Sequence, residues 1–349
     1  MVVFLHKCPQ CQLFYARIAK IWYNHPDGDM EMAKYTDFGL ANTHDMFADA
    51  YANGYAIGAF NFYNMETFSA ILMAARDTHS PIIMAVSESA LRYMGDEMLM
   101  SMVRGANIKP HEQIALHLDH GHSFESCAHA IDLGFSSVMI DASAMPFQEN
   151  INLARRVVEY AHARNTTVEA ELGTLAGFED ENTNSDAEIF TRPSDAVEFV
   201  SRTGTDSLAV AIGTSHGAYK RKNDNESLRF DILAELEVKL PGFPIVLHGA
   251  SCIPRVLVDI INQNGGKMPG ARGIPIDQLK RAAKMNVCKI NVDSDNRMAF
   301  TAAIREMFST QPDVFNPREY LDAAKTAVYD NTVGEIVNIM NSANRVVSG

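Results

Sequence analysis

The chain has 349 residues, of which 47% are hydrophobic and 21% charged, a composition typical of a globular protein with a sizeable core. It contains 30 Lys and Arg against 43 Asp and Glu, and this formal charge of −13 argues against nucleic acid as the main partner. No apolar run approaches the roughly 20 residues that span a bilayer, so we expect no association with a membrane.

The cysteines are few and odd in number: Cys8, Cys11, Cys127, Cys252 and Cys288. Such sparse usage predicts reduced thiols rather than a disulfide framework, and therefore a cytoplasmic location.

Residues 1–34 differ in character from the rest, because Lys7, Arg17 and Lys20 punctuate an apolar stretch. We expect an N-terminal extension that is poorly ordered or non-native, with residues 35–349 forming a single domain. The pair Cys8 and Cys11 has no second ligand pair and no βαβ context, so it predicts neither a metal site nor a redox site.

From about residue 51 onward, short β-rich runs alternate with longer helical patterns, which is typical of repeated βα units. Strands are predicted over 55–61, 82–87, 114–120, 137–142, 167–173, 208–214, 245–251 and 287–294. Helices with an apolar face are predicted over segments such as 65–79, 152–164 and 277–284. Eight parallel strands predict an α/β fold, a (β/α)₈ TIM barrel, with a doubly wound sheet as the alternative. Segments 175–191 and 265–275 are predicted to be long active-site loops.

Nearly every predicted strand ends in polar residues, and barrel active sites gather at the carboxyl ends of strands. These residues are Asn61, Ser87, Asp119, His120, Asp141, Glu171, His216, His248, Asn291 and Asp293. Three histidines, each followed by a glycine, could hold a zinc ion and leave one coordination position open. Asp119 is then either a general base or a residue that orients an imidazole, and the sequence leaves both roles open.

Glycine and serine turns after the last three strands predict a phosphate site. The residues are Gly217 with Lys220, Gly249 with Ser251, and Asn291 through Ser294. Backbone amides in such turns, with a lysine charge nearby, form an anion-binding nest. Arg297 and Arg318 could bind a second anionic group.

Six strings carry a specific family resemblance. They are His117-Leu-Asp-His120-Gly, Gly134-Phe-Ser-Ser-Val-Met-Ile-Asp141, Val168-Glu-Ala-Glu-Leu-Gly173, Ala211-Ile-Gly-Thr-Ser-His216-Gly-Ala-Tyr-Lys220, Val246-Leu-His-Gly-Ala-Ser251 and Lys289-Ile-Asn-Val-Asp-Ser-Asp-Asn-Arg297. Over about residues 35–329 the chain resembles the class II, metal-dependent ketose-bisphosphate aldolases, and most of all their fructose-1,6-bisphosphate branch. The resemblance implies the barrel fold and a reversible cleavage, through a zinc-stabilised enediolate, to dihydroxyacetone phosphate and glyceraldehyde 3-phosphate.

The same resemblance implies roles for individual residues. His120, His216 and His248 would hold zinc, with Asp141 and Glu171 near the metal. Asp119 would be the base on the C4 hydroxyl, and Glu179, on a mobile acidic loop, would assist proton transfer. The implied substrate-binding residues are Asn61, Ser87, Gly217, Lys220, Gly249, Ser251, Asn291, Asp293, Ser294, Arg297 and Arg318. A monovalent cation, Na⁺ or K⁺, is implied near Gly217, as is a homodimer or higher homo-oligomer in which Arg297 reaches the neighbour's C6 phosphate.

Several alternatives stay open at this point. Tagatose 1,6-bisphosphate is the nearest rival substrate; Asp293 and Arg297 favour fructose, but Asn316 stands where the fructose branch often has Asp. The pair His120 and His122 resembles the H-x-H motif of zinc-dependent barrel hydrolases. Lys289 could form a Schiff base in a metal-free aldolase, although a buried ion pair is the expectation for it. A non-catalytic partner-binding barrel is the remaining alternative.

Overall fold

The computed structural model describes residues 33–346, apart from 176, 180–181, 185–188 and 220–226. The predicted extension, with Cys8 and Cys11, therefore lies almost wholly outside the described residues and stays a prediction. Among the helices that are described, none combines the length and hydropathy needed to cross a membrane.

Eight parallel strands close into a barrel, and the last strand pairs with the first. In order around the ring they are β1 (Ile57–Asn61), β2 (Ile82–Ser87), β3 (Ile114–Gly121), β4 (Ser137–Ile140), β5 (Thr167–Leu172), β8 (Ser207–Val210), β9 (Ile245–Leu247) and β10 (Val287–Val292). The predicted TIM barrel is confirmed, and the doubly wound sheet is wrong.

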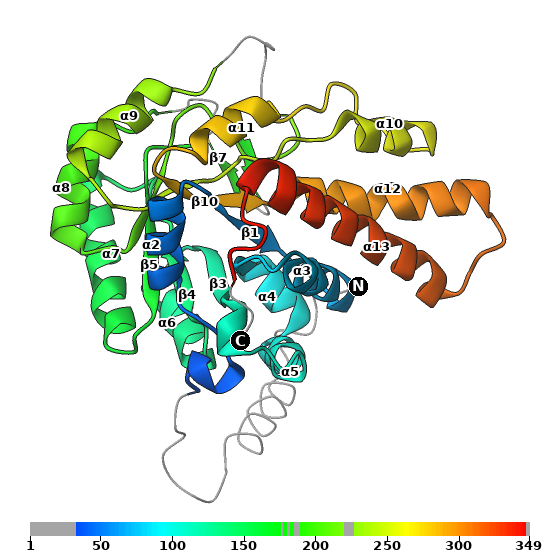
Figure 1. Ribbon diagram of the computed structural model, residues 1–349, viewed down its shortest axis with the longest axis horizontal. Coiled ribbons are helices and arrows are strands. Elements are labelled where there is room, and N and C mark those ends of the chain that lie inside the picture. The colour runs from blue at the N-terminus through cyan, green and yellow to red at the C-terminus, as the bar shows by residue number, and fades with distance from the viewer. Residues whose placement is uncertain (1–32, 176, 180–181, 185–188, 220–226, 347–349) are drawn as a thin grey trace, which may run out of the picture. The chain divides into compact units, whose positions relative to one another are not determined.

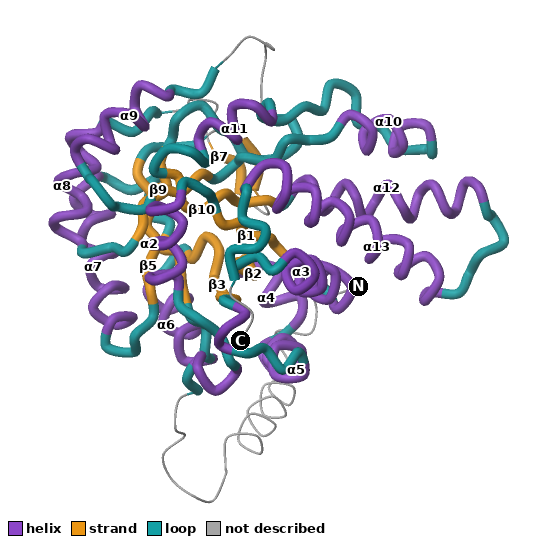
Figure 2. The backbone as a smooth tube through the Cα atoms, in the orientation of Figure 1, coloured by secondary structure: helices purple, strands orange, loops and turns teal. Residues whose placement is uncertain are grey.

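Helices lie outside the strands (Figure 2). They are α2 (Thr43–Asn53), α3 (Met65–Thr78), α4 (Glu88–Met94), α5 (Asp96–Gly105), α6 (Phe124–Leu133), α7 (Phe147–His162), α8 (Pro193–Thr203), α9 (Phe230–Lys239), α10 (Arg255–Gln263), α11 (Ile276–Ala282), α12 (Ser294–Thr310) and α13 (Pro317–Glu335). Short 3₁₀ turns cover Tyr35–Phe38 and Pro110–Glu112, and a π-helical turn covers Ile336–Met340. In α7 the buried positions Ile151, Ala154, Val158 and Ala161 recur every three or four residues, which turns one face onto the sheet.

The last three strands are shorter than predicted. The chain leaves the sheet after Val210 and Leu247, because the following glycines Gly213 (φ 105°) and Gly249 (φ 58°) adopt left-handed conformations that bend it into loops. In the predicted loop 175–191 the structure has a hairpin of β6 (Gly177–Glu179) and β7 (Asn182–Asn184). Its strands lack the alternating apolar pattern that predicts strands from sequence.

Helix α2 closes the amino end of the barrel. Met46, Phe47 and Ala50 pack against the inward side chains of the first strands, such as Ala59 and Ile83, in one buried apolar cluster. At the other side of the molecule α12 and α13 lie side by side and extend away from the strands (Figure 1). The barrel therefore has an apolar floor at its amino end.

The floor yields a first prediction. Phe47 is 2% exposed, so Phe47→Ala is expected to lower the free energy of unfolding by about 3–5 kcal/mol through lost burial and an unfilled cavity. Urea unfolding followed by circular dichroism measures this, with Phe315→Ala as the control, because Phe315 is 89% exposed. Equal effects of the two substitutions would contradict the proposed floor.

Candidate functional site

Asp119 and His120 are adjacent at the carboxyl end of β3, and both side chains lie at the barrel mouth. Regular alternation along a strand would place them on opposite faces. The strand is irregular here: the register with β4 shifts between Leu118 and Gly121, and His120 has a positive φ of 48°. Gly121 permits this path, since a Cβ there would lie 2.7 Å from the Met139 carbonyl oxygen and 2.8 Å from the Cys127 sulfur.

His248 and His216 come from the loops after β9 and β8. The rings of His120 and His248 have their centroids 4.5 Å apart, and the His216 ring lies edge-on to His120 at 5.3 Å. A Cβ on Gly249 would lie 2.5 Å from the Ser215 carbonyl carbon, so glycine is needed where the two loops meet. The structure therefore brings the three predicted histidines together.

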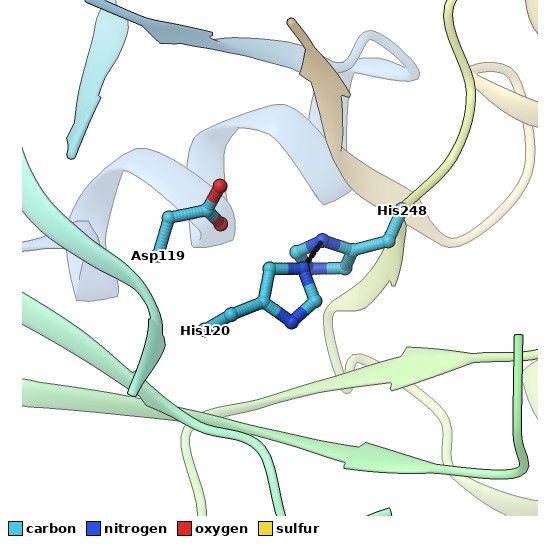
Figure 3. A group of neighbouring side chains, drawn as sticks. All are labelled: Asp119, His120 and His248. Carbon is cyan, nitrogen blue, oxygen red and sulfur yellow. Dashed lines mark hydrogen bonds between the residues drawn. The ribbon is translucent and has the colours of Figure 1, made fainter. Parts of the chain in front are cut away.

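In His120 and in His248, one ring nitrogen lies beside a carboxylate, and this contact decides which ring nitrogen carries the proton. Asp141 Oδ2 lies 3.1 Å from His120 Nδ1, and Glu169 Oε1 lies 2.6 Å from His248 Nε2. An ionised carboxylate only accepts hydrogen bonds, so each of these nitrogens carries the ring proton. The remaining nitrogens, His120 Nε2 and His248 Nδ1, then present lone pairs to each other at 2.9 Å (Figure 3).

Two facing lone pairs need a cation, so this donor set fits a metal ion. Donor atoms of Asp119, His120 and His248 lie within 4.8 Å of one another, as do those of His120, Asp141 and Glu171. Burial is the main cause that lowers the pKa of His248 below its usual value, and it favours the neutral, metal-binding form of the ring.

The carboxylate of Asp119 is buried and held by two amides. Asn61 Nδ2 donates to Oδ2 at 2.8 Å, and Asn291 Nδ2 donates to Oδ1 at 2.9 Å. The amide oxygens of both asparagines are themselves buried and accept no hydrogen bond from the described residues. A carboxylate acceptor and two unsatisfied amide oxygens therefore stand where a polyhydroxy ligand can donate to them.

These groups line a cavity of about 290 Å³ at the barrel mouth. Its lining includes predicted residues from β1, β3, β10, the start of α12 and the loops after β8 and β9: Asn61, Asp119, His216, Gly217, His248, Gly249, Ser251, Asn291, Asp293, Ser294 and Arg297. Met268, from the predicted loop 265–275, also lines it. The Arg297 Nε donates to Asp293 Oδ1 and to the Tyr63 hydroxyl, each at 2.8 Å, so its guanidinium is held at the rim.

Other predicted residues lie elsewhere or outside the described residues. Ser87 caps α4 by accepting a hydrogen bond from the Ala90 amide. Arg318 lies in the first turn of α13, beside Asn316, and not in the cavity lining. The side chain of Glu179 and the whole of Lys220 are outside the described residues, so their roles stay predictions.

The sequence reasoning missed Glu169, which contacts a predicted metal ligand. A signal existed, because Glu169 and Glu171 have the same parity in β5 and therefore face the barrel interior together. Glu169 also accepts from Lys289 Nζ at 2.7 Å, and both side chains are buried. The expected buried ion pair of Lys289 is thus confirmed. Its ammonium group binds Glu169 below the barrel mouth, which argues against a Schiff base between Lys289 and a carbonyl substrate.

Comparisons with known proteins identify a family for this chain. The family described as fructose-bisphosphate aldolase class-II matches residues 41–345. The chain is 48% identical to the fructose-bisphosphate aldolase of Treponema pallidum (strain Nichols) over 332 residues, which cover 90% of this chain and 100% of the relative. It is 46% identical to that of Giardia intestinalis, covering 85% of this chain and 92% of the relative.

Solved structures show the same architecture. The YdjI aldolase from Escherichia coli K12 superposes with a TM-score of 0.70 at 29% identity, covering 88% of this chain and all of that chain. The fructose-bisphosphate aldolase from Campylobacter jejuni superposes with a TM-score of 0.66 at 21% identity, covering 89% and 99% of the two chains, which supports the fold alone.

The close contacts at Gly121 lead to a second prediction. Gly121→Ala is expected to push the end of β3 away from β4, displace His120 and lower the bound metal well below one ion per chain. Elemental analysis after gel filtration measures this, with Gly334→Ala as the control, since no atom lies within 4 Å of a Cβ at that position. Full metal content in the folded Gly121→Ala variant would show that the β3 irregularity does not position the ligand.

Proposed function

This chain belongs to the class II fructose-bisphosphate aldolase family, and from that premise we propose which of its residues cleave fructose 1,6-bisphosphate. The reaction breaks the C3–C4 bond reversibly and yields dihydroxyacetone phosphate and glyceraldehyde 3-phosphate. The observation that carries the assignment is the cavity lined by the amide-held Asp119 and by His248, together with the donor atoms of Asp119, His120 and His248 that lie within 4.8 Å of one another. We assign the reaction to glycolysis and gluconeogenesis.

The family is metal-dependent, and we propose that His120, His216 and His248 hold a zinc ion in this chain. Bound there, the metal supplies Lewis-acid polarisation of the C2 carbonyl, the electron sink that cleavage requires. Asp141 orients His120 through a hydrogen bond with Nδ1, and Glu169 orients His248 through a hydrogen bond with Nε2. These are the ring nitrogens that do not face the proposed metal.

Asp119 is the proposed general base. Its carboxylate takes the proton of the C4 hydroxyl. The O–H electron pair forms the aldehyde C=O, the C3–C4 pair forms the C2=C3 bond, and the pair of the C2 carbonyl bond moves onto its oxygen. The Asn61 and Asn291 amides hold the orientation of the carboxylate by donating hydrogen bonds to it, and their amide oxygens accept hydrogen bonds from substrate hydroxyls. Such a positioned base contributes about 10²–10⁴-fold to the rate. Glu179 is the proposed proton donor to C3.

The C1 phosphate is assigned to the rim formed by Gly249, Ser251, Ser294 and the N-terminus of α12, and the charge of Lys220 is proposed to attract it. Helix N-termini and exposed backbone amides favour anions there. Near Gly217 the hydroxyl oxygen of Thr214 is buried and has no hydrogen-bond partner among the described residues. This unsatisfied oxygen supports the proposed Na⁺ or K⁺ site.

The far phosphate is assigned to an arginine shared between subunits. The side chain of Arg297 is 45% exposed at the rim and is braced by Asp293 and Tyr63. We propose a homodimer or higher homo-oligomer in which Arg297 reaches the neighbour's C6 phosphate. We also propose a cytoplasmic location, which the free thiols of Cys127, Cys252 and Cys288 support.

Family membership decides against the hydrolase alternative, and no observation at the cavity favours tagatose over fructose bisphosphate. His122 is exposed and its backbone amide binds Glu88. Asn316 caps α13 by accepting from the Arg318 amide, a role that asparagine and aspartate fill equally well. The departure at Asn316 therefore preserves the local structure of α13.

Metal removal tests the proposed zinc site. Cleavage of fructose 1,6-bisphosphate is expected to vanish after exhaustive chelation and to return with Zn²⁺, because the electron sink is then restored. The rate of glyceraldehyde 3-phosphate formation measures it, with tagatose 1,6-bisphosphate run beside it. Undiminished activity of the metal-free protein would overturn the proposal.

The role of Asp119 is tested by Asp119→Asn, which keeps the size of the side chain but removes the base. We expect kcat to fall by about 10²–10⁴-fold with zinc content unchanged. Steady-state kinetics and elemental analysis measure the two quantities, and Asp49→Asn, remote from the cavity, is the control. A near-normal kcat would remove Asp119 as the base.

A further inference from the structure

Below the metal ligands, a column of buried polar side chains crosses the barrel. Lys289 Nζ donates to Glu169 Oε2 at 2.7 Å and lies 3.4 Å from His117 Nε2. Ser137 Oγ lies 2.8 Å from His117 Nδ1 at one end of the column. At the other end Glu169 Oε1 lies 2.6 Å from His248 Nε2.

Each bond in this column has a defined direction. The Lys289 ammonium can only donate, so His117 Nε2 accepts and the His117 ring proton lies on Nδ1, facing Ser137. Burial first, and then the Lys289 charge, lowers the pKa of His117 to about 3, so this ring is neutral. The Glu169 carboxylate can only accept, and it receives one bond from Lys289 and one from His248.

Packing alone does not account for a charged pair at this depth. An apolar cluster lies at the same level of the barrel and consists of Met139, Ala209 and Val246. In the strand register Met139 is paired with Glu169, and Val246 is paired with Lys289. Ala209 is paired with Glu171 on one side and with Val246 on the other. A buried ion pair in such surroundings is often no more stabilising than apolar residues of similar volume. The pair therefore calls for a role other than stability, and its contact with His248 indicates which.

We propose that Lys289 and Glu169 are positioning residues that hold His248 with its proton on Nε2 and so present Nδ1 to the metal. Lys289 holds the Glu169 carboxylate in place through its hydrogen bond, and Glu169 then selects the tautomer and the ring orientation of His248. The inference rests on the proposed metal site and adds two residues for which the sequence analysis predicts no metal-related role.

Charge-neutral double variants separate this role from a structural one. Glu169→Leu with Lys289→Met removes both charges together and leaves no buried charge unpaired, but nothing then holds His248. Glu169→Gln with Lys289→Met is equally neutral and keeps an amide oxygen that can accept from His248 Nε2. Glu112→Gln, which breaks a carboxylate–arginine pair away from the site, is the control.

The readout is metal binding, which is independent of turnover. Co²⁺ is titrated into the metal-free proteins and followed by its visible absorption, and Zn²⁺ affinity is measured by competition with a chelator. We expect Kd to rise by about 10–100-fold in the Leu/Met variant and to stay closer to the wild-type value in the Gln/Met variant. Equal Kd values for the two folded double variants would overturn the proposal, since a structural role predicts no difference.

A measurement on the unaltered protein does not depend on whether the variants fold. Nitrogen-15 NMR of the histidine-labelled, metal-free chain is expected to show His248 protonated at Nε2. A His248 proton on Nδ1 would overturn the proposal. Absence of aldolase activity together with the expected Kd pattern would count against the proposed function alone, which keeps the two failures distinguishable.

Discussion

Closing eight parallel strands into a barrel removes water from every inward side chain, so each inward polar group must find its partner inside. The lower interior satisfies this constraint with apolar residues packed on α2. The middle satisfies it with the directed chain Ser137, His117, Lys289 and Glu169. At the mouth, Asn61 and Asn291 retain unsatisfied oxygens, and the lone pairs of His120 and His248 face each other. The proposed reaction site is therefore the part of the barrel interior where polar groups are not fully paired with one another.

Backbone conformations that side chains rarely adopt are found at the mouth. His120 and Ile253 both have positive φ, and the second is a β-branched residue for which this is unusual. Asp295, in the first turn of α12, holds the loop after β9 by accepting from the amides of Cys252 and Ile253 at 2.8 and 2.7 Å. The two segments assigned to the phosphate are therefore tied together by one buried carboxylate.

This tie also explains why cysteine is accepted at position 252. The contact to Asp295 uses the backbone amide, which any residue other than proline supplies. Burial, followed by the charge of Glu335, raises the pKa of the Cys252 thiol, so it stays protonated and weakly reactive. The side chain at position 252 can therefore vary while the loop after β9 keeps its hydrogen bonds to Asp295.

The sequence by itself determined the βα repeat, the barrel and most of the cavity lining, because strand patterns are local and barrel topology sends every strand end to one mouth. It did not place Asp119 and His120 on the same side, which needed the register shift beside Gly121. It did not pair Glu169 with Lys289 either, since these residues lie 120 positions apart and no local pattern encodes which inward side chains meet. Tertiary structure decided the partners, and the partners set which ring nitrogens of His120 and His248 face each other.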